Sequence, residues 1–195
     1  MRPKKIYLAS NSPRRQELLR QAGIRFQVKV AHEQEIFPDS LQVYAVPEFL
    51  ASYKAHEVKK TLEHDSIVIA ADTVVIVDNT ILGKPSNESD AFEMLGQLSG
   101  KTHDVLTGVC IIGSTEICLF TDTTQVTFRK LDHNKMAKYV NSFKPYDKAG
   151  AYAIQEWIGL VGIKRISGDY FNVMGLPIGR VLEMLESLEG PLDSW

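Results

Sequence analysis

The stretch Leu8-Ala-Ser-Asn-Ser-Pro-Arg-Arg-Gln-Glu-Leu-Leu19 decides how this chain folds and where it can bind a ligand. A short apolar strand leads into it and a helix leaves it. Pro13 suits the first helical turn, and Gly23 predicts the end of the helix. Ser12 is a good N-cap residue for this helix. Because free N–H groups and the positive end of the helix dipole converge at such a point, the stretch predicts an anion site.

Four side chains of the stretch could complete that anion site. Arg14 and Arg15 supply guanidinium groups, and Ser10 and Ser12 supply hydroxyl groups, in place of the bare backbone of a glycine-rich phosphate loop. A second interpretation fits the same residues, namely a capped helix with two solvated arginines. The stretch by itself does not decide between the two.

Composition restricts the partners that this chain can have. Its 195 residues are 44% hydrophobic and 24% charged, which is enough for one large domain or two small lobes with a real core. The formal net charge of -2 creates no field that would draw the chain to nucleic acid or to an anionic membrane. Any phosphate must therefore be held by a local cluster of cations.

The compartment can be predicted from apolar runs and cysteines. No stretch is long and apolar enough for a signal peptide or a transmembrane span, so we expect a cytoplasmic protein. Cys110 and Cys118 flank a predicted turn and could face each other across a hairpin, but two apolar thiols in a reduced core are the preferred interpretation. The oligomeric state stays open, with a homodimer as the candidate assembly.

A predicted helix and a predicted strand each carry one charged residue of interest. Residues 46–62 repeat apolar side chains at helical spacing, and Lys54 on this helix is by its ordinary interpretation a surface lysine. The apolar run 66–72 is typical of a central strand and ends in Asp72, after which 73–77 continues extended. Burying a carboxylate between two apolar runs costs several kcal/mol unless it is paired or metal-bound. We therefore assign a function to Asp72.

The rest of the chain predicts alternating helices and strands without an internal repeat. We expect strands at 26–30 and 160–166, a hairpin of 103–112 with 116–128, a helix capped by Asn87 or Ser89 and ended by Gly100, a helix capped by Asp132, and a last helix at 178–188. His103 is interpreted as a surface or loop histidine, since no second histidine lies at ligand spacing. The pattern predicts a mixed α/β sheet flanked by helices.

Basic, acidic and flat polar side chains recur in loops and at strand ends. They are the cations Arg14, Arg15, Lys54 and Lys84, the carboxylates Glu35 and Asp72, and the polar residues Thr73 and Gln155. Carboxylates among cations, without a cysteine or histidine ligand set, suit Mg²⁺ or Mn²⁺ together with a polyphosphate substrate. The sequence contains neither a P-loop motif nor a serine nucleophile elbow, so it disfavours a P-loop NTPase and a serine hydrolase.

Six motifs follow one another over nearly the whole chain. They are Leu-Ala-Ser-x-Ser-Pro-Arg-Arg-x-Glu-Leu-Leu (8–19), Ala-Asp-Thr-Val-Val (71–75), Leu-Gly-Lys-Pro (82–85), Leu-Ser-Gly-x-x-His (98–103), Asp-Lys-Ala-Gly-Ala-Tyr-x-Ile-Gln (147–155) and Gly-Leu-Pro (175–177). With these motifs the sequence resembles the Maf family of nucleoside triphosphate pyrophosphatases, also called septum-formation inhibitor proteins. The resemblance implies a single domain over residues 1–195, two lobes with a central cleft as in inosine triphosphatases, and a divalent metal. It also implies hydrolysis of a nucleoside triphosphate to the monophosphate and pyrophosphate.

The resemblance further implies roles by position. Asp72 would be the general base, Asp72 and Glu35 the metal ligands, and the substrate would be bound by Ser10, Ser12, Arg14, Arg15, Lys54, Thr73, Lys84 and Gln155.

The segment 147–155 is similar to the branch of the family that acts on dTTP and UTP. The Gln155 amide could pair with the O4 and N3–H edge of uracil or thymine and would match cytosine only in part, so CTP is expected to be weaker. Two features depart from the family pattern. Glu156 stands where the family commonly has glycine, and the acidic loop leaves Glu33 and Glu35 as alternatives, of which we choose Glu35.

Two functions of other classes were weighed. A non-catalytic regulator of cell division that binds a nucleotide or a protein would need the cleft but not Asp72, and the sequence shows no apolar docking stripe for it. An RNA-base binder that uses Tyr146, Tyr152 and Trp157 lacks the expected excess of basic residues. Cleaning of nucleotide pools and arrest of division both remain as cellular roles.

Overall fold

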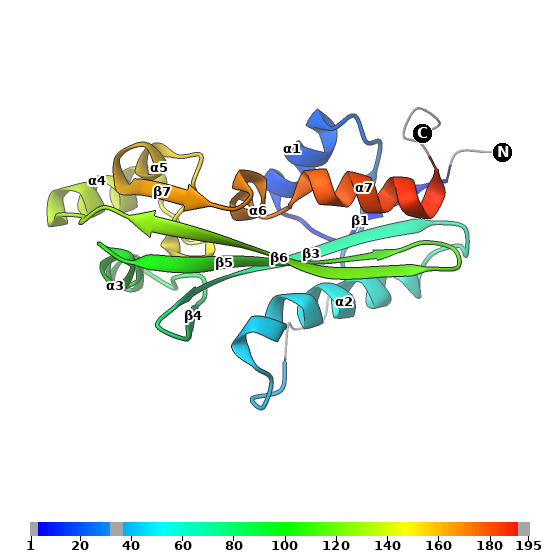
Figure 1. Ribbon diagram of the computed structural model, residues 1–195, viewed down its shortest axis with the longest axis horizontal. Coiled ribbons are helices and arrows are strands. Elements are labelled where there is room, and N and C mark those ends of the chain that lie inside the picture. The colour runs from blue at the N-terminus through cyan, green and yellow to red at the C-terminus, as the bar shows by residue number, and fades with distance from the viewer. Residues whose placement is uncertain (1–3, 32–36, 191–195) are drawn as a thin grey trace. The chain divides into compact units, whose positions relative to one another are not determined.

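The protein, seen here as a computed structural model that describes residues 4–31 and 37–190, is built on a mixed sheet flanked by helices (Figure 1). Its strands are β1 (Ile6–Leu8), β2 (Gln27–Val28), β3 (Ile67–Val77), β4 (Thr80–Leu82), β5 (Thr102–Ile112), β6 (Ile117–Phe128) and β7 (Ile163–Ser167). Their order in the sheet is β2-β1-β3-β5-β6-β7, with β4 paired to β3. This confirms the α/β class that the sequence predicts.

The chain folds into two compact units. Unit 1 comprises Met1–Asp72, Thr107–Asp122 and Gly175–Trp195, and unit 2 comprises Thr73–Leu106 and Thr123–Met174. The strands β3, β5 and β6 each contribute one part to either unit. The division on β3 falls directly after Asp72, so the predicted neighbours Asp72 and Thr73 belong to different units.

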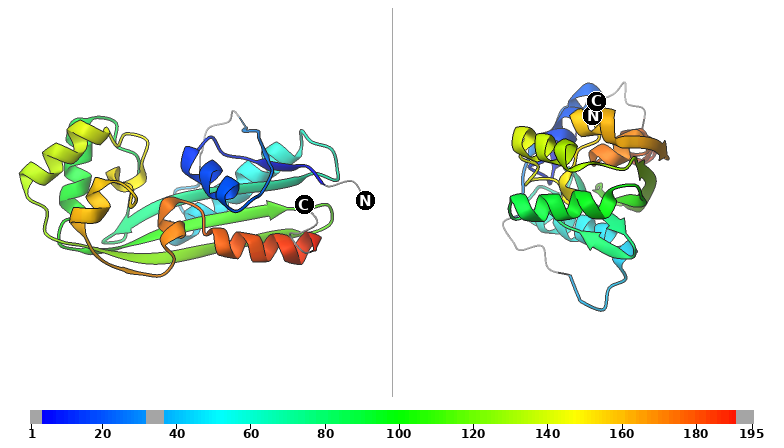
Figure 2. Two further views of the ribbon diagram at one scale, coloured as in Figure 1. Left: turned by 90° about the horizontal axis from the view of Figure 1, so that it is seen from above. Right: turned by 90° about the vertical axis from the view of Figure 1, so that its left-hand side faces the viewer.

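Unit 1 has helices on both faces of its part of the sheet. They are α1 (Pro13–Gln21), η1 (Val43–Ala45), α2 (Val46–Lys59) and α7 (Ile178–Glu189). α2 packs Ala51 against Val68 and Ala70 of β3, whereas α1 and α7 lie on the opposite face (Figure 1, Figure 2). Gly108 of β5 allows α2 to come close, because a Cβ at this position would lie 2.3 Å from the backbone of Pro47.

Unit 2 has its own hydrophobic core. Its helices are α3 (Glu88–Leu98), α4 (His133–Phe143), η2 (Ala149–Ala151), α5 (Trp157–Gly162) and α6 (Tyr170–Met174). Leu95 and Phe128 are among the residues buried in this core. The side chains of Asn87 and Asp132 cap α3 and α4, which confirms Asp132 and selects Asn87 over Ser89. No helix in the described ranges is long and apolar enough to span a membrane.

β5 and β6 form the predicted hairpin. At its turn the Gly113 N–H donates to the Glu116 carbonyl over 2.9 Å. Cys110 is buried and Cys118 is partly exposed, and neither forms a disulfide. Burial raises the pKa of the Cys110 thiol to about 12, so this cysteine is a protonated core residue at neutral pH.

Two predicted strands differ from the structure. The strand expected at 26–30 is reduced to β2, two residues that pair with β1 at the edge of the sheet and are both exposed. The strand expected at 160–166 begins only at Ile163, because α5 continues to Gly162. Gly159 explains this compact helix, since a Cβ there would lie 1.8 Å from the Ile154 carbonyl oxygen.

Candidate active site

The loop after β1 in unit 1 is held by hydrogen bonds centred on Ser10. The buried Ser10 Oγ accepts from the Ser12 backbone N–H over 3.2 Å and from Arg15 Nη1 over 3.1 Å. Arg15 Nε also donates to the Gly175 carbonyl over 2.8 Å. The interpretation of Arg15 as a solvated arginine is therefore wrong, because its guanidinium ties the loop to the segment that precedes α7.

α1 begins at Pro13 as predicted, but the Ser12 side chain does not cap it. Ser12 occupies the N-cap position and its carbonyl accepts the Gln16 N–H over 3.2 Å, yet its hydroxyl makes no capping hydrogen bond. The loop instead folds back so that the Ser12 N–H meets Ser10. The Ser12 hydroxyl therefore accepts no hydrogen bond from the backbone N–H groups of the first turn of α1. A bound anion could accept hydrogen bonds from these N–H groups instead.

Lys54 and Asp72 form an ion pair in unit 1. Lys54 Nζ on α2 lies 2.5 Å from Asp72 Oδ1 on β3, and the two side chains are 17% and 13% exposed. The ordinary interpretation of Lys54 as a surface lysine is therefore wrong. The pairing explains how an otherwise apolar strand tolerates a carboxylate.

Strand register places Asp72, in the middle of β3, near the carboxyl end of β1, where the Ser10 loop begins. β1 pairs with β3 so that Leu8 lies beside Ile69, and the Ala9 N–H donates to the Ile69 carbonyl over 2.8 Å. β1 therefore ends where β3 runs on to Asp72. Because ligands of open α/β sheets bind outside the carboxyl ends of parallel strands, this end is the candidate site of unit 1.

Thr73, Lys84 and Gln155 lie in unit 2 on segments that contact one another, whereas Arg14 belongs to α1 of unit 1. Thr73 belongs to β3, Lys84 follows β4, and Gln155 precedes α5. The Gly150 N–H donates to the Gly83 carbonyl over 3.0 Å, which joins the segment that carries Gln155 to the one that carries Lys84. Both Lys84 and Gln155 are exposed, so each can meet a ligand.

Gly150 also packs against β3. It has a φ of 66°, and a Cβ there would lie 3.0 Å from a methyl carbon of Val75, two residues after Thr73. Glycine is favoured here on both counts, since other residues rarely adopt a positive φ and a Cβ would contact Val75 tightly. These two constraints explain why the motif 147–155 has a glycine at position 150.

A buried lysine that sequence reasoning missed lies in the same segment. Lys148 Nζ is 2.7 Å from Asp147 Oδ1 and 3.4 Å from Glu156 Oε1, and the lysine side chain is only 8% exposed. The Tyr139 hydroxyl donates to Glu156 Oε2 and accepts from the Ala153 N–H over 3.1 Å. No periodicity links Tyr139 on α4 to Glu156, so the sequence offered no signal for this network beyond the charges themselves.

Comparison with known proteins decides the family. Residues 5–188 match the family described as Maf-like protein.

The chain belongs to the Maf-like family. A protein of Phocaeicola vulgatus named dTTP/UTP pyrophosphatase is 48% identical to it over 185 residues, which cover 94% of this chain and 96% of that protein. A protein of Flavobacterium johnsoniae with the same name is 42% identical over 184 residues, which cover 94% of this chain and 95% of that protein. A third so named, from Bacteroides fragilis strain YCH46, is 46% identical over 185 residues, which cover 94% and 96%.

Among solved structures, the matches are more distant. The nucleoside-triphosphatase / dITP/XTP pyrophosphatase of Mycobacterium abscessus is 16% identical, with a TM-score of 0.42 over 65% of this chain and 75% of that chain. The Ham1 protein of Staphylococcus aureus is 17% identical, with a TM-score of 0.43 over 64% and 72%. Likeness at this level supports no conclusion about the function of the Maf-like chain.

His103 of the Maf-like chain is a core residue of β5, which corrects the prediction of a surface or loop histidine. It is 2% exposed, and its Nε2 shares a hydrogen bond of 2.8 Å with the Tyr152 hydroxyl. Burial lowers the pKa of His103 to about 4, although the nearby Asp104 acts in the opposite direction. The ring is therefore neutral at neutral pH, and it packs edge-on against Phe128 and Tyr152.

Of the predicted metal ligands, the structure describes Asp72. Glu35 and its alternative Glu33 lie outside the described residues. Within residues 4–31 and 37–190, no three His, Cys, Asp or Glu side chains form a group that could hold a metal ion. Asp72 offers one carboxylate, and Mg²⁺ commonly binds through one or two carboxylates together with substrate phosphates. The donor set therefore fits a metal that arrives with a triphosphate.

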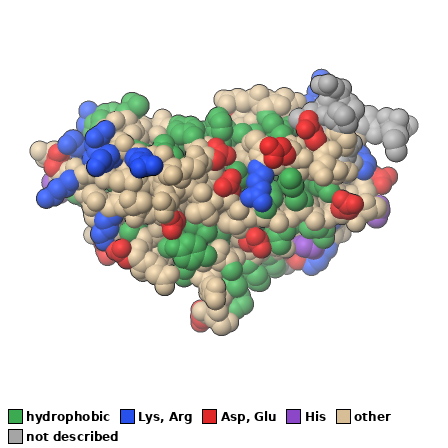
Figure 3. All heavy atoms as spheres, in the orientation of Figure 1, with side chains coloured by type: hydrophobic (Ala, Val, Ile, Leu, Met, Phe, Trp, Pro, Cys, Tyr) green, Lys and Arg blue, Asp and Glu red, His purple; other side chains and the backbone are tan. Residues whose placement is uncertain are grey.

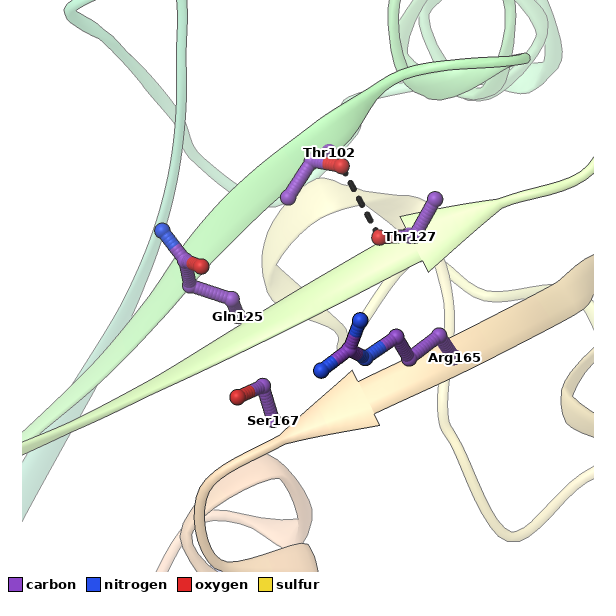
Figure 4. A pocket seen from close by; sticks show the side chains of 5 residues that line it. All are labelled: Thr102, Gln125, Thr127, Arg165 and Ser167. Atoms are coloured by element: carbon purple, nitrogen blue, oxygen red, sulfur yellow. Dashed lines mark hydrogen bonds between the residues drawn. The ribbon is translucent and has the colours of Figure 1, made fainter.

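A polar hollow of about 220 Å³ lies on unit 2 (Figure 4). Its lining residues are Thr102, Gln125, Thr127, Arg165 and Ser167, and the hydroxyls of Thr102 and Thr127 share a hydrogen bond of 2.8 Å. Lysine and arginine side chains gather over the same end of unit 2, around α4 and β7 (Figure 3). None of the five residues was predicted for the site, and alternating polar residues are what the water-facing side of an antiparallel sheet carries.

Proposed function

We propose that this Maf-like chain is a nucleoside triphosphate pyrophosphatase that hydrolyses dTTP and UTP to the monophosphate and pyrophosphate. The observation that carries the proposal is the Lys54–Asp72 pair near the carboxyl end of β1, where the loop of Ser10 and Arg15 begins. This arrangement offers a carboxylate that can accept a proton from water and cations that can hold phosphate. Relatives named dTTP/UTP pyrophosphatase, 42% and 48% identical over most of the chain, support the same activity.

The triphosphate is held by N–H donors and cations in this proposal. In unit 1 these are Arg14, the hydroxyls of Ser10 and Ser12, and the N-terminus of α1. Lys84 is assigned to phosphate from the sequence alone, and its side chain is exposed. Charge-assisted hydrogen bonds to phosphate are roughly twice as strong as neutral ones. We assign Arg15 the task of holding the loop that presents these groups, since it binds both Ser10 and Gly175.

Asp72 is assigned the role of general base. Water attacks the α-phosphorus, the bond from this phosphorus to the oxygen that bridges to the β-phosphorus breaks, and pyrophosphate leaves. The proton of the water passes to Asp72. Lys54 holds Oδ1, so Oδ2 is the oxygen assigned to take the proton. A positioned general base contributes about 10²–10⁴-fold in rate.

A divalent cation, Mg²⁺ or Mn²⁺, is part of the proposal. As the alternative to its role as base, Asp72 would be a protein ligand of this ion, and Glu35 is assigned as a ligand on the strength of the sequence alone. When bound, such an ion neutralises phosphate charge and makes a bound water more acidic. We therefore expect pyrophosphate release to stop when EDTA removes divalent ions and to return with added Mg²⁺ or Mn²⁺.

Base selection is assigned to the exposed side chains of unit 2. Gln155 offers one acceptor and two donors, which match the edge of uracil or thymine and fit cytosine only in part. We propose that dTTP and UTP are the best substrates and that CTP is weaker. A cytoplasmic role in cleaning nucleotide pools belongs to the same proposal, because it is the role that hydrolysis of free triphosphates would serve.

The experiment is a panel of dTTP, UTP, CTP, ATP and GTP, with release of pyrophosphate measured as kcat/KM. The two pyrimidine substrates dTTP and UTP should lead, CTP should follow, and both purines should be poor. Gln155→Ala should lower kcat/KM for UTP by about tenfold or more, because a buried polar edge of the base loses its partner. A purine preference in the wild-type enzyme, or no release from any triphosphate, contradicts the proposal.

A further inference from the structure

Lys148 belongs to a network of charged and polar side chains and is unusually buried for a lysine. Lysine is almost never fully buried unless it is paired, and the Lys148 side chain is 8% exposed between the carboxylates of Asp147 and Glu156. Glu156 is the less exposed of these two acids, at 22% against 60%. It also accepts the Tyr139 hydroxyl. Glu156 is therefore the centre of the network and the direct neighbour of Gln155 in the chain.

The backbone of this segment needs an external constraint. Its residues from Pro145 to Gln155 belong to no strand and, apart from the single turn η2, to no helix. Lys144, Gly150 and Ala151 have φ angles of 44°, 66° and 57°. A residue with a Cβ in this left-handed region costs roughly 1–2 kcal/mol. Such a shape persists only when the surrounding structure imposes it.

The network supplies that constraint from both sides of Gln155. On the side before it, the Ala153 N–H donates to the Tyr139 hydroxyl over 3.1 Å. On the side after it, Glu156 binds the same hydroxyl and Lys148. The Glu156 N–H also donates to the Ala153 carbonyl over 3.1 Å, which closes a turn around Ile154 and Gln155. One tyrosine of α4 thus holds the chain on either side of the exposed amide.

We propose that Glu156, held by Tyr139 and Lys148, is a positioning residue that fixes the direction of Gln155 and so sets the preference for uracil and thymine over cytosine. This inference rests on the proposed function. Lys148 is not a phosphate-binding cation in it, because its Nζ already meets two carboxylates. Lys84, which is exposed, keeps that task.

The test uses two variants that remove single interactions. Tyr139→Phe deletes the hydroxyl that joins Ala153 to Glu156, and Glu156→Gln keeps the shape but removes the charge opposite Lys148. Matched controls are Tyr170→Phe on α6 and Glu183→Gln on α7, where both side chains are exposed. For each protein, kcat and KM are measured separately with UTP and CTP, and the melting temperature is recorded.

Both variants should lower the ratio of kcat/KM for UTP to that for CTP by about three- to tenfold, the value of one misplaced hydrogen bond. The loss should appear as a higher KM for UTP, with kcat retained, and the controls should keep the wild-type ratio. A purely structural network would lower the melting temperature and leave the ratio unchanged, and that result overturns the inference. If Glu156→Gln does not fold, Tyr139→Phe decides by the same ratio. A wild-type enzyme that prefers a purine triphosphate, or that releases no pyrophosphate, overturns the proposed function instead, so the two failures are distinguishable.

Discussion

Two lysine–carboxylate pairs, one in each unit, are built in opposite ways. In unit 1, Lys54 and Asp72 stand on a helix and a strand, and the backbone ladders of α2 and β3 determine where the two side chains meet. In unit 2, Lys148 and Glu156 stand on irregular chain, and their contact helps to determine where the backbone goes. The fold thus positions the Lys54–Asp72 pair, whereas the Lys148–Glu156 pair helps to position the backbone around it.

This difference predicts different costs when a partner is removed. A pair held by regular elements can lose its charge while the elements stay in place, so its variants should report on chemistry. A pair that shapes a loop should lose structure together with charge, so its variants should report on stability and on the orientation of what the loop carries. The next three predictions use this contrast.

The largest effect is expected for Asp72→Asn. The variant keeps the shape of the side chain and its place on β3, so the protein should fold, while kcat for UTP should fall by about 10²–10⁴-fold with the loss of a general base. Glu156→Gln, the same chemical change in the other pair, should retain kcat. Steady-state kinetics with UTP and circular dichroism provide the measurement. A near-normal kcat for Asp72→Asn would exclude Asp72 as the base.

The second effect concerns stability. Lys148→Met leaves the half-buried Glu156 without its cation and also frees the irregular segment that the pair shapes, so it should lower the free energy of unfolding by about 3–5 kcal/mol. Lys54→Met should cost less, about 1–3 kcal/mol, because α2 and β3 remain packed without it. Lys101, which pairs with Asp78 on the surface, provides the control, and Lys101→Met should cost at most about 1 kcal/mol. Urea unfolding measures all three, and equal losses for Lys148→Met and Lys54→Met would remove the contrast between the pairs.

The smallest effect concerns His103, a buried ionisable group of unit 2 that forms no ion pair with any residue of the described ranges. Its pKa of about 4 in the folded protein lies below the ordinary value of 6.5, so the unfolded chain binds more protons between these values. Stability is therefore fully present above pH 6.5 and is lost as the pH falls toward 4. Between pH 7 and pH 5 this residue should contribute a loss of about 2 kcal/mol.

His103→Gln keeps a hydrogen-bonding group near Tyr152 and removes the titration. Urea unfolding at pH 7 and pH 5 should show a smaller pH dependence for the variant than for the wild type. Equal pH dependence in the two proteins would mean that His103 is not protonated on unfolding.

Features carried by regular elements could be predicted from the sequence. The hairpin of β5 and β6, the caps Asn87 and Asp132 and the position of Asp72 inside an apolar strand follow from periodicity and local chemistry. The start of α1 at Pro13 was equally local. In each case the signal lies within a few residues of the element that it describes.

Features that depend on contacts distant in sequence could not be predicted. Arg15 donates from its guanidinium to the Gly175 carbonyl, 160 residues away, rather than to water. The Lys54 ammonium group binds the carboxylate of Asp72, 18 residues away, rather than water. His103 is buried by Tyr152, 49 residues away. Each side chain was interpreted from its neighbours in sequence, and each is placed by tertiary packing.

The position of bond cleavage tests the central claim most directly. UTP is hydrolysed by the protein in water enriched in ¹⁸O, and the products are followed by ³¹P NMR and mass spectrometry. Attack of water on the α-phosphorus predicts UMP and pyrophosphate in equal amounts, with the ¹⁸O in the phosphate of UMP. Formation of UDP and inorganic phosphate, or ¹⁸O in the pyrophosphate, would contradict it.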